Sequence, residues 1–147
     1  MDWAGAFDPD FVARYVLRHG HAGWLDLKYR AHGEDWVELE LPWRDDLVGD
    51  TGGQTLASGP IVSLMDMASG MCIWQTSGAF AAIATLDLRV DYMRPSRERA
   101  AVIGRSHCYK LTRSAAFVRG IAYDGDPSDP VANVSAVFMS IKRKTDG

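Results

Sequence analysis

The sequence predicts an α+β fold in which a mostly antiparallel sheet wraps around one long helix. Three observations favour this class. The longest apolar segment, residues 58–74, has the periodicity of a buried helix. Six shorter segments have the pattern of strands, and turn signals rich in Gly, Asp and Pro separate several of them. A helix and a sheet that each bury one face pack stably as layers.

The chain begins with a short predicted helix followed by two predicted strands. In residues 8–19, apolar side chains recur at helical spacing behind an Asp-Pro start signal, and the helix is expected to end near Gly20. Residues 23–30 and 34–41 then alternate between apolar and polar side chains. We therefore expect two antiparallel strands joined by a turn at residues 32–33.

After a predicted loop over residues 42–56, the central helix carries the first candidate for chemistry. Gly59 followed by Pro60 suits a helix start, because a proline at the first helical position loses no hydrogen bond. Asp66 is the only ionisable side chain in residues 58–74. A charge on such a helix is costly to desolvate unless it is paired or used, so Asp66 is the first residue expected to act in catalysis.

Four further strands are predicted after this helix. The first alternates strictly and is ended by Pro95, whereas the last is apolar on both faces, which predicts a central position in the sheet. Their expected bounds are residues 84–93, 100–111, 115–123 and 131–142.

Composition narrows the class of protein further. The 147 residues predict one domain, residues 1–147, and a net charge of −3 argues against a nucleic-acid partner. No apolar run approaches the roughly 20 residues that span a membrane. Cys72 and Cys108 lie in apolar segments and are expected to be buried free thiols in a reducing cytoplasm. The four histidines lack the spacing of metal ligands, so no metal site is expected.

Two segments together resemble a known family. Residues 58–66, SGPIVSLMD, combine a glycine at a helix start with a Leu-x-Asp motif. Residues 84–95, ATLDLRVDYMRP, form an alternating strand that ends in Tyr-Met-x-Pro. In this order and spacing they are similar to the phenylacetate-degradation-type (PaaI-like) acyl-CoA thioesterases. That family has the hotdog fold, an antiparallel sheet around one central helix, and the likeness covers about residues 48–141.

The resemblance implies a set of site residues. The family's oxyanion-binding backbone N–H falls on Gly59 and its catalytic carboxylate on Asp66. A hydroxyl that holds the attacking water, supplied by the neighbouring subunit, falls on Thr85. Ser58 stands where the family has histidine, and Pro60 where it has a second glycine. The expected substrate-binding residues are Asp50, Gln54 and Ser58 near the thioester, and Arg113 and Arg97 near the phosphates of coenzyme A.

The activity implied by the resemblance is acyl-CoA hydrolysis to a free acid and coenzyme A. Coenzyme A is part of the substrate, and no metal or cofactor is expected. Asp66 would activate a water as general base or attack the thioester directly, and the sequence leaves both routes open. A shared site implies a homodimer, with a dimer of dimers as the larger assembly.

Other interpretations remain open at this point. The lost histidine favours a hotdog protein that binds acyl-CoA without hydrolysing it, and an acyl-CoA hydratase or dehydratase is a further alternative. Asp66 could also be a structural carboxylate bonded to the backbone or to Ser69, and Thr85 an ordinary strand residue.

Overall fold

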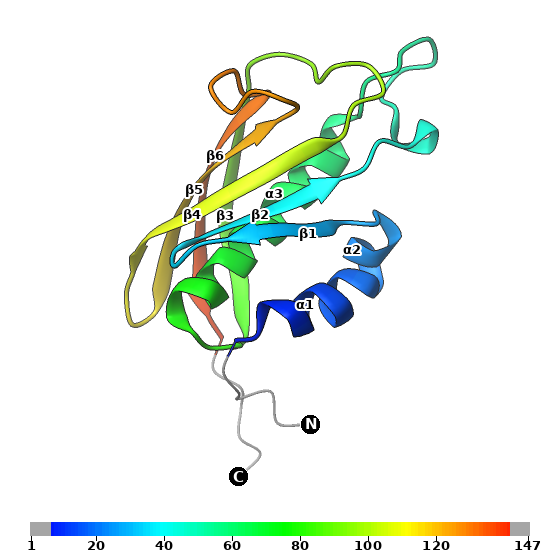
Figure 1. The fold of residues 1–147 in the computed structure, drawn as a ribbon. Coiled ribbons are helices and arrows are strands. Elements are labelled where there is room, and N and C mark those ends of the chain that lie inside the picture. Colours follow the sequence, from blue (N-terminus) through cyan, green and yellow to red (C-terminus); the bar gives the residue numbers. More distant parts are fainter. Residues whose placement is uncertain (1–6, 142–147) are drawn as a thin grey trace.

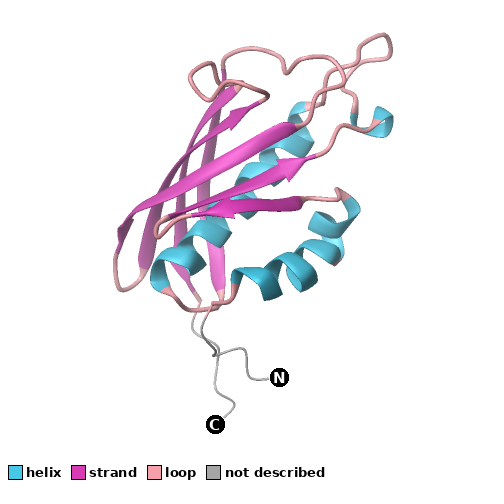
Figure 2. Ribbon diagram, viewed as in Figure 1, coloured by secondary structure: helices cyan, strands magenta, loops and turns pink. Residues whose placement is uncertain are grey.

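One long helix packs against a six-stranded antiparallel sheet in the computed structural model, which describes residues 7–141 (Figure 1). The predicted α+β class is therefore confirmed. Figure 2 shows the strands as one layer, with α1 and α2 near its β1 edge. The elements are α1 (Pro9–Tyr15), η1 (Val16–Arg18), α2 (Gly20–Trp24), β1 (Lys28–His32), β2 (Trp36–Leu41), η2 (Asp45–Leu47), α3 (Ser58–Ser77), β3 (Ile83–Tyr92), β4 (Val102–Leu111), β5 (Ala115–Tyr123) and β6 (Ala132–Ser140).

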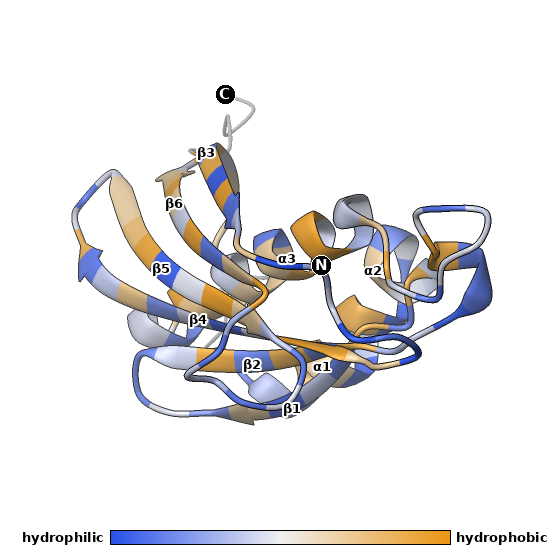
Figure 3. Cartoon of the chain, turned by 90° about the horizontal axis from the view of Figure 1, so that it is seen from above, coloured by the Kyte–Doolittle hydropathy of each residue, from blue (hydrophilic) through white to orange (hydrophobic). Residues whose placement is uncertain are grey.

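The strand order of the sheet is β1-β2-β4-β5-β6-β3, and all neighbouring pairs are antiparallel. β6 lies between β5 and β3, which confirms its predicted central position. Seen from above, the sheet curves around α3 (Figure 3). β3 forms one edge, and its register with β6 shifts between Thr85 and Asp87. Such a shift changes the direction in which nearby side chains point.

Two glycines in neighbouring strands let α3 approach the sheet closely. A Cβ added to Gly104, in β4, would lie 2.8 Å from Sδ of Met65 and 2.9 Å from Cγ of Leu64. A Cβ added to Gly120, in β5, would lie 2.9 Å from Cε of Met65. Since Leu64 and Met65 are fully buried, the apolar face of α3 rests where these strands have no side chains. The opposite face of α3 carries the half-buried Asp66.

The N-terminal segment differs from its prediction. Residues 20–24 form the helix α2, so the first strand begins at Lys28 and not at residue 23. Asp26 has a φ of 57°, a left-handed conformation that interrupts any strand at this position. The alternating leucines on either side of it are buried by a turn that leaves a helix. The predicted helix over residues 8–19 is also divided, because α1 gives way to the 3₁₀-helix η1.

The central helix begins two residues before Pro60, which was predicted to be its first residue. Ala57 is its N-cap, Ser58 its first residue, and Pro60 its third, where a missing N–H is still tolerated. The helix continues to Ser77 and ends at Gly78, whose φ of 68° suits a helix C-terminus. The turn between β1 and β2 and the strands after α3 lie within a few residues of their predicted bounds. None of the helices in residues 7–141 is long and apolar enough to cross a membrane.

An ion-pair cluster, the Arg94–Asp124 clamp, joins the connection after β3 to the connection after β5. Arg94 donates to both carboxylate oxygens of Asp124, at 2.7 and 3.0 Å. The backbone N–H of Arg97 donates to the same carboxylate at 2.7 Å. The side chain of Asp124 is only 2% exposed. The Arg94 guanidinium therefore holds the pKa of Asp124 below its usual range.

Candidate active site

Asp66 and Thr85 meet at the flank of α3. Oγ1 of Thr85 donates to Oδ1 of Asp66 at 2.7 Å. This contact forms within one chain. The expectation that the neighbouring subunit supplies the hydroxyl stays a prediction. The register shift beside Thr85 accounts for its orientation toward its own helix. Ser69, the structural alternative as a partner for Asp66, instead pairs with Ser106 in the core at 3.2 Å.

The start of α3 presents backbone N–H groups that no side chain caps. The N-cap residue, Ala57, makes no side-chain hydrogen bond. Ser58 and Gly59 are both exposed, and a Cβ added to Gly59 would meet no atom within 4 Å. Nothing in the described chain therefore requires a glycine at this position. The first N–H groups of a helix and the positive end of its dipole suit an oxygen that gains negative charge.

Tyr92 connects this helix start to the end of β3. Its hydroxyl donates to the carbonyl of Ser58 at 2.9 Å. Partial burial raises the pKa of Tyr92, which keeps this donor protonated. A cavity of about 370 Å³ lies beside the contact and is lined in part by Ser58, Ile61 and Tyr92. Asp66 follows Gly59 by seven residues, roughly 10 Å along the helix, so the two lie on nearly the same side.

A further polar contact on this side was missed by sequence reasoning. Nε2 of His21, in α2, lies 2.8 Å from Oγ of Ser63, in α3. Ser63 comes four residues after Gly59 and three before Asp66, so the three positions share one helix face. That spacing was visible in the sequence. No local pattern, however, connects Ser63 to a histidine 42 residues away.

Asp50 and Gln54 lie in the loop before α3 and line a different cavity, of about 680 Å³. Oε1 of Gln54 accepts from Nε of Arg99 at 2.6 Å, and its carbonyl accepts from Nε1 of Trp43 at 2.7 Å. Gln54 is thus held by Trp43 of its own loop and by Arg99 of the connection between β3 and β4, whereas Asp50 is exposed. Neither Asp50 nor Gln54 is among the described residues that line the cavity at the start of α3. Their expected contact with a thioester stays a prediction.

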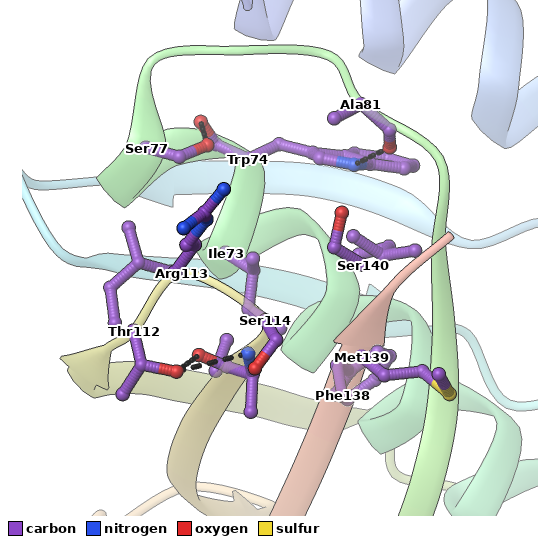
Figure 4. A pocket seen from close by; sticks show the side chains of 14 residues that line it. Ile73, Trp74, Ser77, Ala81, Thr112, Arg113, Ser114, Phe138, Met139 and Ser140 are labelled. Atoms are coloured by element: carbon purple, nitrogen blue, oxygen red, sulfur yellow. Dashed lines mark hydrogen bonds between the residues drawn. The ribbon is translucent and has the colours of Figure 1, made fainter. Parts of the chain in front are cut away.

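Arg113 lies near the opposite end of α3. It borders a cavity of about 170 Å³ together with Ile73, Trp74 and Ser77 (Figure 4). In that view its guanidinium points toward Ser77. Within one chain, the structure therefore does not bring Arg113 to Gly59, at the other end of the helix. Its contact with the phosphates of coenzyme A stays a prediction.

Arg97 belongs to the Arg94–Asp124 clamp. Its side chain donates to the carbonyl of Asp124, and its backbone N–H donates to the carboxylate. The Arg97 side chain is nevertheless 65% exposed. The predicted phosphate contact of Arg97 is untested, and its observed contacts are structural.

Comparison with known proteins identifies the family. The model of the thioesterase superfamily matches residues 53–131, more than half of the chain. The crystal structure of a Pseudomonas aeruginosa protein is 32% identical, with a TM-score of 0.80 over 90% of this chain and 98% of that one. A Ralstonia eutropha protein, provisionally described as a thioesterase related to phenylacetic acid degradation, is 20% identical, with a TM-score of 0.73 over 89% and 98%. At that identity the likeness shows the fold alone.

One curated relative matches this chain over a smaller part of its own length. A Halobacterium salinarum protein, provisionally named an esterase, is 29% identical over 98 residues. The match covers 62% of this chain but only 65% of that protein, slightly less than two thirds of its length.

The region matched by the family model contains Gly59, Ser63, Asp66 and Thr85, while His21 precedes it. The strand order, the long helix inside a curved sheet and the family match all agree with the resemblance seen in the two sequence segments. The chain belongs to the thioesterase superfamily and has the hotdog fold of the PaaI-like thioesterases.

Proposed function

We propose that this protein is an acyl-CoA thioesterase, which hydrolyses an acyl-CoA to a free acid and coenzyme A without a metal or other cofactor. Membership of the family supports thioester hydrolysis in general. The observation that carries the proposal is the Asp66–Thr85 hydrogen bond on the helix that also presents an uncapped N-terminus. A carboxylate and an unpaired amide on one helix face are the two groups that thioester hydrolysis needs.

The helix start supplies the oxyanion site. When a nucleophile attacks the thioester, the carbonyl oxygen gains negative charge and needs donors at its new position. The N–H groups of Ser58 and Gly59 can take this role, and the absence of a Cβ on Gly59 lets the substrate approach. One such donor typically lowers the barrier by about 2.7–4 kcal/mol. Because the donors belong to the backbone, the serine that replaces the family's histidine does not remove them.

Asp66 acts as the general base in this mechanism. Oδ1 accepts the hydrogen bond of Thr85, which orients the carboxylate and leaves Oδ2 for a water. The carboxylate takes a proton from the water as the new C–O bond forms. The tetrahedral intermediate then breaks its C–S bond, and the proton passes to the coenzyme A thiolate. Direct attack by Asp66 is the competing route, and ¹⁸O found in its carboxylate after one turnover in labelled water would assign it.

A homodimer, extended to a dimer of dimers, completes the proposal. β3 is a ten-residue edge strand, and Leu86 within it is 64% exposed. The N–H and C=O groups of such an edge can pair with a strand of a second copy. The buried free thiols Cys72 and Cys108 favour the reducing cytoplasm as its compartment.

The test of the proposal is a thiol-release assay over a panel of acyl-CoAs with the wild type and Asp66→Asn. We expect the variant to keep its fold and to lose about 10²- to 10⁴-fold in kcat, because it cannot accept a proton. Asp87→Asn, which changes an exposed carboxylate on the same strand as Thr85, should retain full activity. Burial raises the pKa of both cysteine thiols, so the native protein should add little background. Equal turnover by Asp66→Asn and the wild type would sink the proposal.

The alternative is a protein that binds acyl-CoA without hydrolysing it, and one observation favours it. Ser58 and Pro60 occupy positions where the family has histidine and glycine. This alternative predicts saturable binding of acyl-CoA with no thiol released by the wild type. The same assay, paired with calorimetric titration, distinguishes the two functions.

A further inference from the structure

The His21–Ser63 contact gives the open face of α3 a second polar group beside Asp66. Nε2 of His21 and Oγ of Ser63 are 2.8 Å apart, a normal hydrogen-bond distance. Ser63 is half-buried and His21 is exposed. The view from above places α2 beside α3 (Figure 3). The face of α3 is thus flanked by a histidine from α2 on one side and by Thr85 from β3 on the other.

The direction of helical side chains brings the Ser63 hydroxyl toward the helix start. Side chains on a helix lean toward its N-terminus and cover the preceding turn. For Ser63 the preceding turn contains Gly59, which has no side chain and leaves open space. The hydroxyl and the free N–H groups of the helix start therefore border the same space, and Asp66 lies one turn further along.

The imidazole determines which way the hydroxyl can donate. If Nε2–H of His21 donates to Oγ, the O–H of Ser63 is free to donate to a ligand. Without that donor, the hydroxyl of a helical serine can turn back to the carbonyl four residues earlier. His21 thus supplies a reason for Ser63 to point outward.

We propose that Ser63 is a further catalytic residue, whose hydroxyl donates to the carbonyl oxygen of the thioester beside the N–H groups of the helix start. His21 is its positioning residue. This inference rests on the proposed thioesterase function and deepens the same site. It adds a side-chain donor to the two backbone donors, and it takes that donor's orientation from a helix outside the region matched by the family.

Kinetics of four single variants and one double variant test the assignment. Ser63→Ala should lower kcat about 10- to 100-fold with little change in KM. His21→Ala should lower kcat less than Ser63→Ala does. In the Ser63→Ala background, His21→Ala should cause no further loss of kcat. His21→Gln, which keeps an N–H donor, should retain the kcat that His21→Ala loses. His19→Ala is the matched control, because His19 lies in the same segment but bonds to the carbonyl of Tyr15. Unfolding curves of all variants should coincide with that of the wild type.

Binding of two substrate analogues provides a readout that would not change if Ser63 had only a structural role. One is a ketone in which a methylene replaces the thioester sulfur, and the other lacks the carbonyl. Ser63→Ala should weaken binding of the ketone about tenfold and leave the other analogue unaffected. Equal affinity of wild type and Ser63→Ala for the ketone, or unchanged kcat, would overturn the inference while leaving the thioesterase intact. A wild type without turnover, or a fully active Asp66→Asn, would overturn both.

Discussion

At the scale of single residues, Gly59 and Asp66 are held differently. Asp66 is fixed by a donor from another element, whereas the surroundings of Gly59 are empty. Because these surroundings are empty, no contact within the described part of the chain requires a glycine at position 59. In the proposed mechanism the substrate does, because its carbonyl must reach the backbone N–H.

Replacing Gly59 with alanine separates these two influences. The added Cβ meets no atom within 4 Å, so Gly59→Ala should leave the free energy of unfolding unchanged or raise it by up to about 1 kcal/mol. The same methyl group displaces the substrate, and kcat/KM should fall about 10- to 100-fold, since a shift of about 1 Å can cost 10²-fold. Urea unfolding and the thiol-release assay measure the two effects. Gly52→Ala, another glycine with open space, should change neither.

At the scale of elements, the contact between α3 and the sheet sets the position of the site. Gly104→Ala would place a Cβ 2.8 Å from Met65 and 2.9 Å from Leu64. We expect a loss of about 1–3 kcal/mol in the free energy of unfolding, because both neighbours are fully buried and must shift. Gly70→Ala is the contrasting variant within α3, since its Cβ would make ordinary contacts at 3.7 Å with Ile83 and Phe138. A stability loss as large in Gly70→Ala would contradict this explanation.

The bounds of an element were predictable where the spacing of its apolar residues came from the packing of one face of a regular helix or strand. The strands after α3 alternate because one face packs on the helix, and their predicted bounds were close to those observed. The segment at residues 23–30 alternates for a different reason, since the leucines beside Asp26 are buried by a turn. Period alone does not distinguish these cases, because it records burial and not backbone conformation.

The candidate site was predictable to the extent that it lies on α3. Asp66 stood out as a lone charge, and Gly59 as a helix start. The pairing of Thr85 with its own helix depends on a register shift that the alternating pattern does not reveal. His21 approaches Ser63 only because α2 folds back over the helix, which no short-range motif encodes.

At the scale of the whole molecule, the Arg94–Asp124 clamp joins two connections that are distant in sequence. Asp124 has its pKa lowered in the folded state, so it stabilises the fold above its unfolded pKa of about 3.9. This stabilisation is lost as the pH falls through the lower, folded value. Asp124→Asn should therefore be less stable than the wild type by about 3 kcal/mol at pH 7.

The pH dependence of that difference is the sharper measurement. Denaturant unfolding from pH 7 down to pH 2 should show the gap between Asp124→Asn and the wild type closing below about pH 4. Asp87→Asn, on an exposed strand position, should show no comparable gap at any pH. A gap for Asp124→Asn that stayed constant to pH 2 would assign its effect to shape and not to charge.

The helix α2 lies outside residues 53–131, yet its imidazole reaches the face of α3 that carries Asp66. In the proposed mechanism the reacting groups thus lie within the family-matched region, while the imidazole that orients Ser63 lies on a helix that precedes it. His21 is exposed, whereas its neighbour Ala22 is buried in the core. Evolution can therefore exchange the imidazole alone without disturbing the interior, which offers a low-risk route for tuning turnover among relatives.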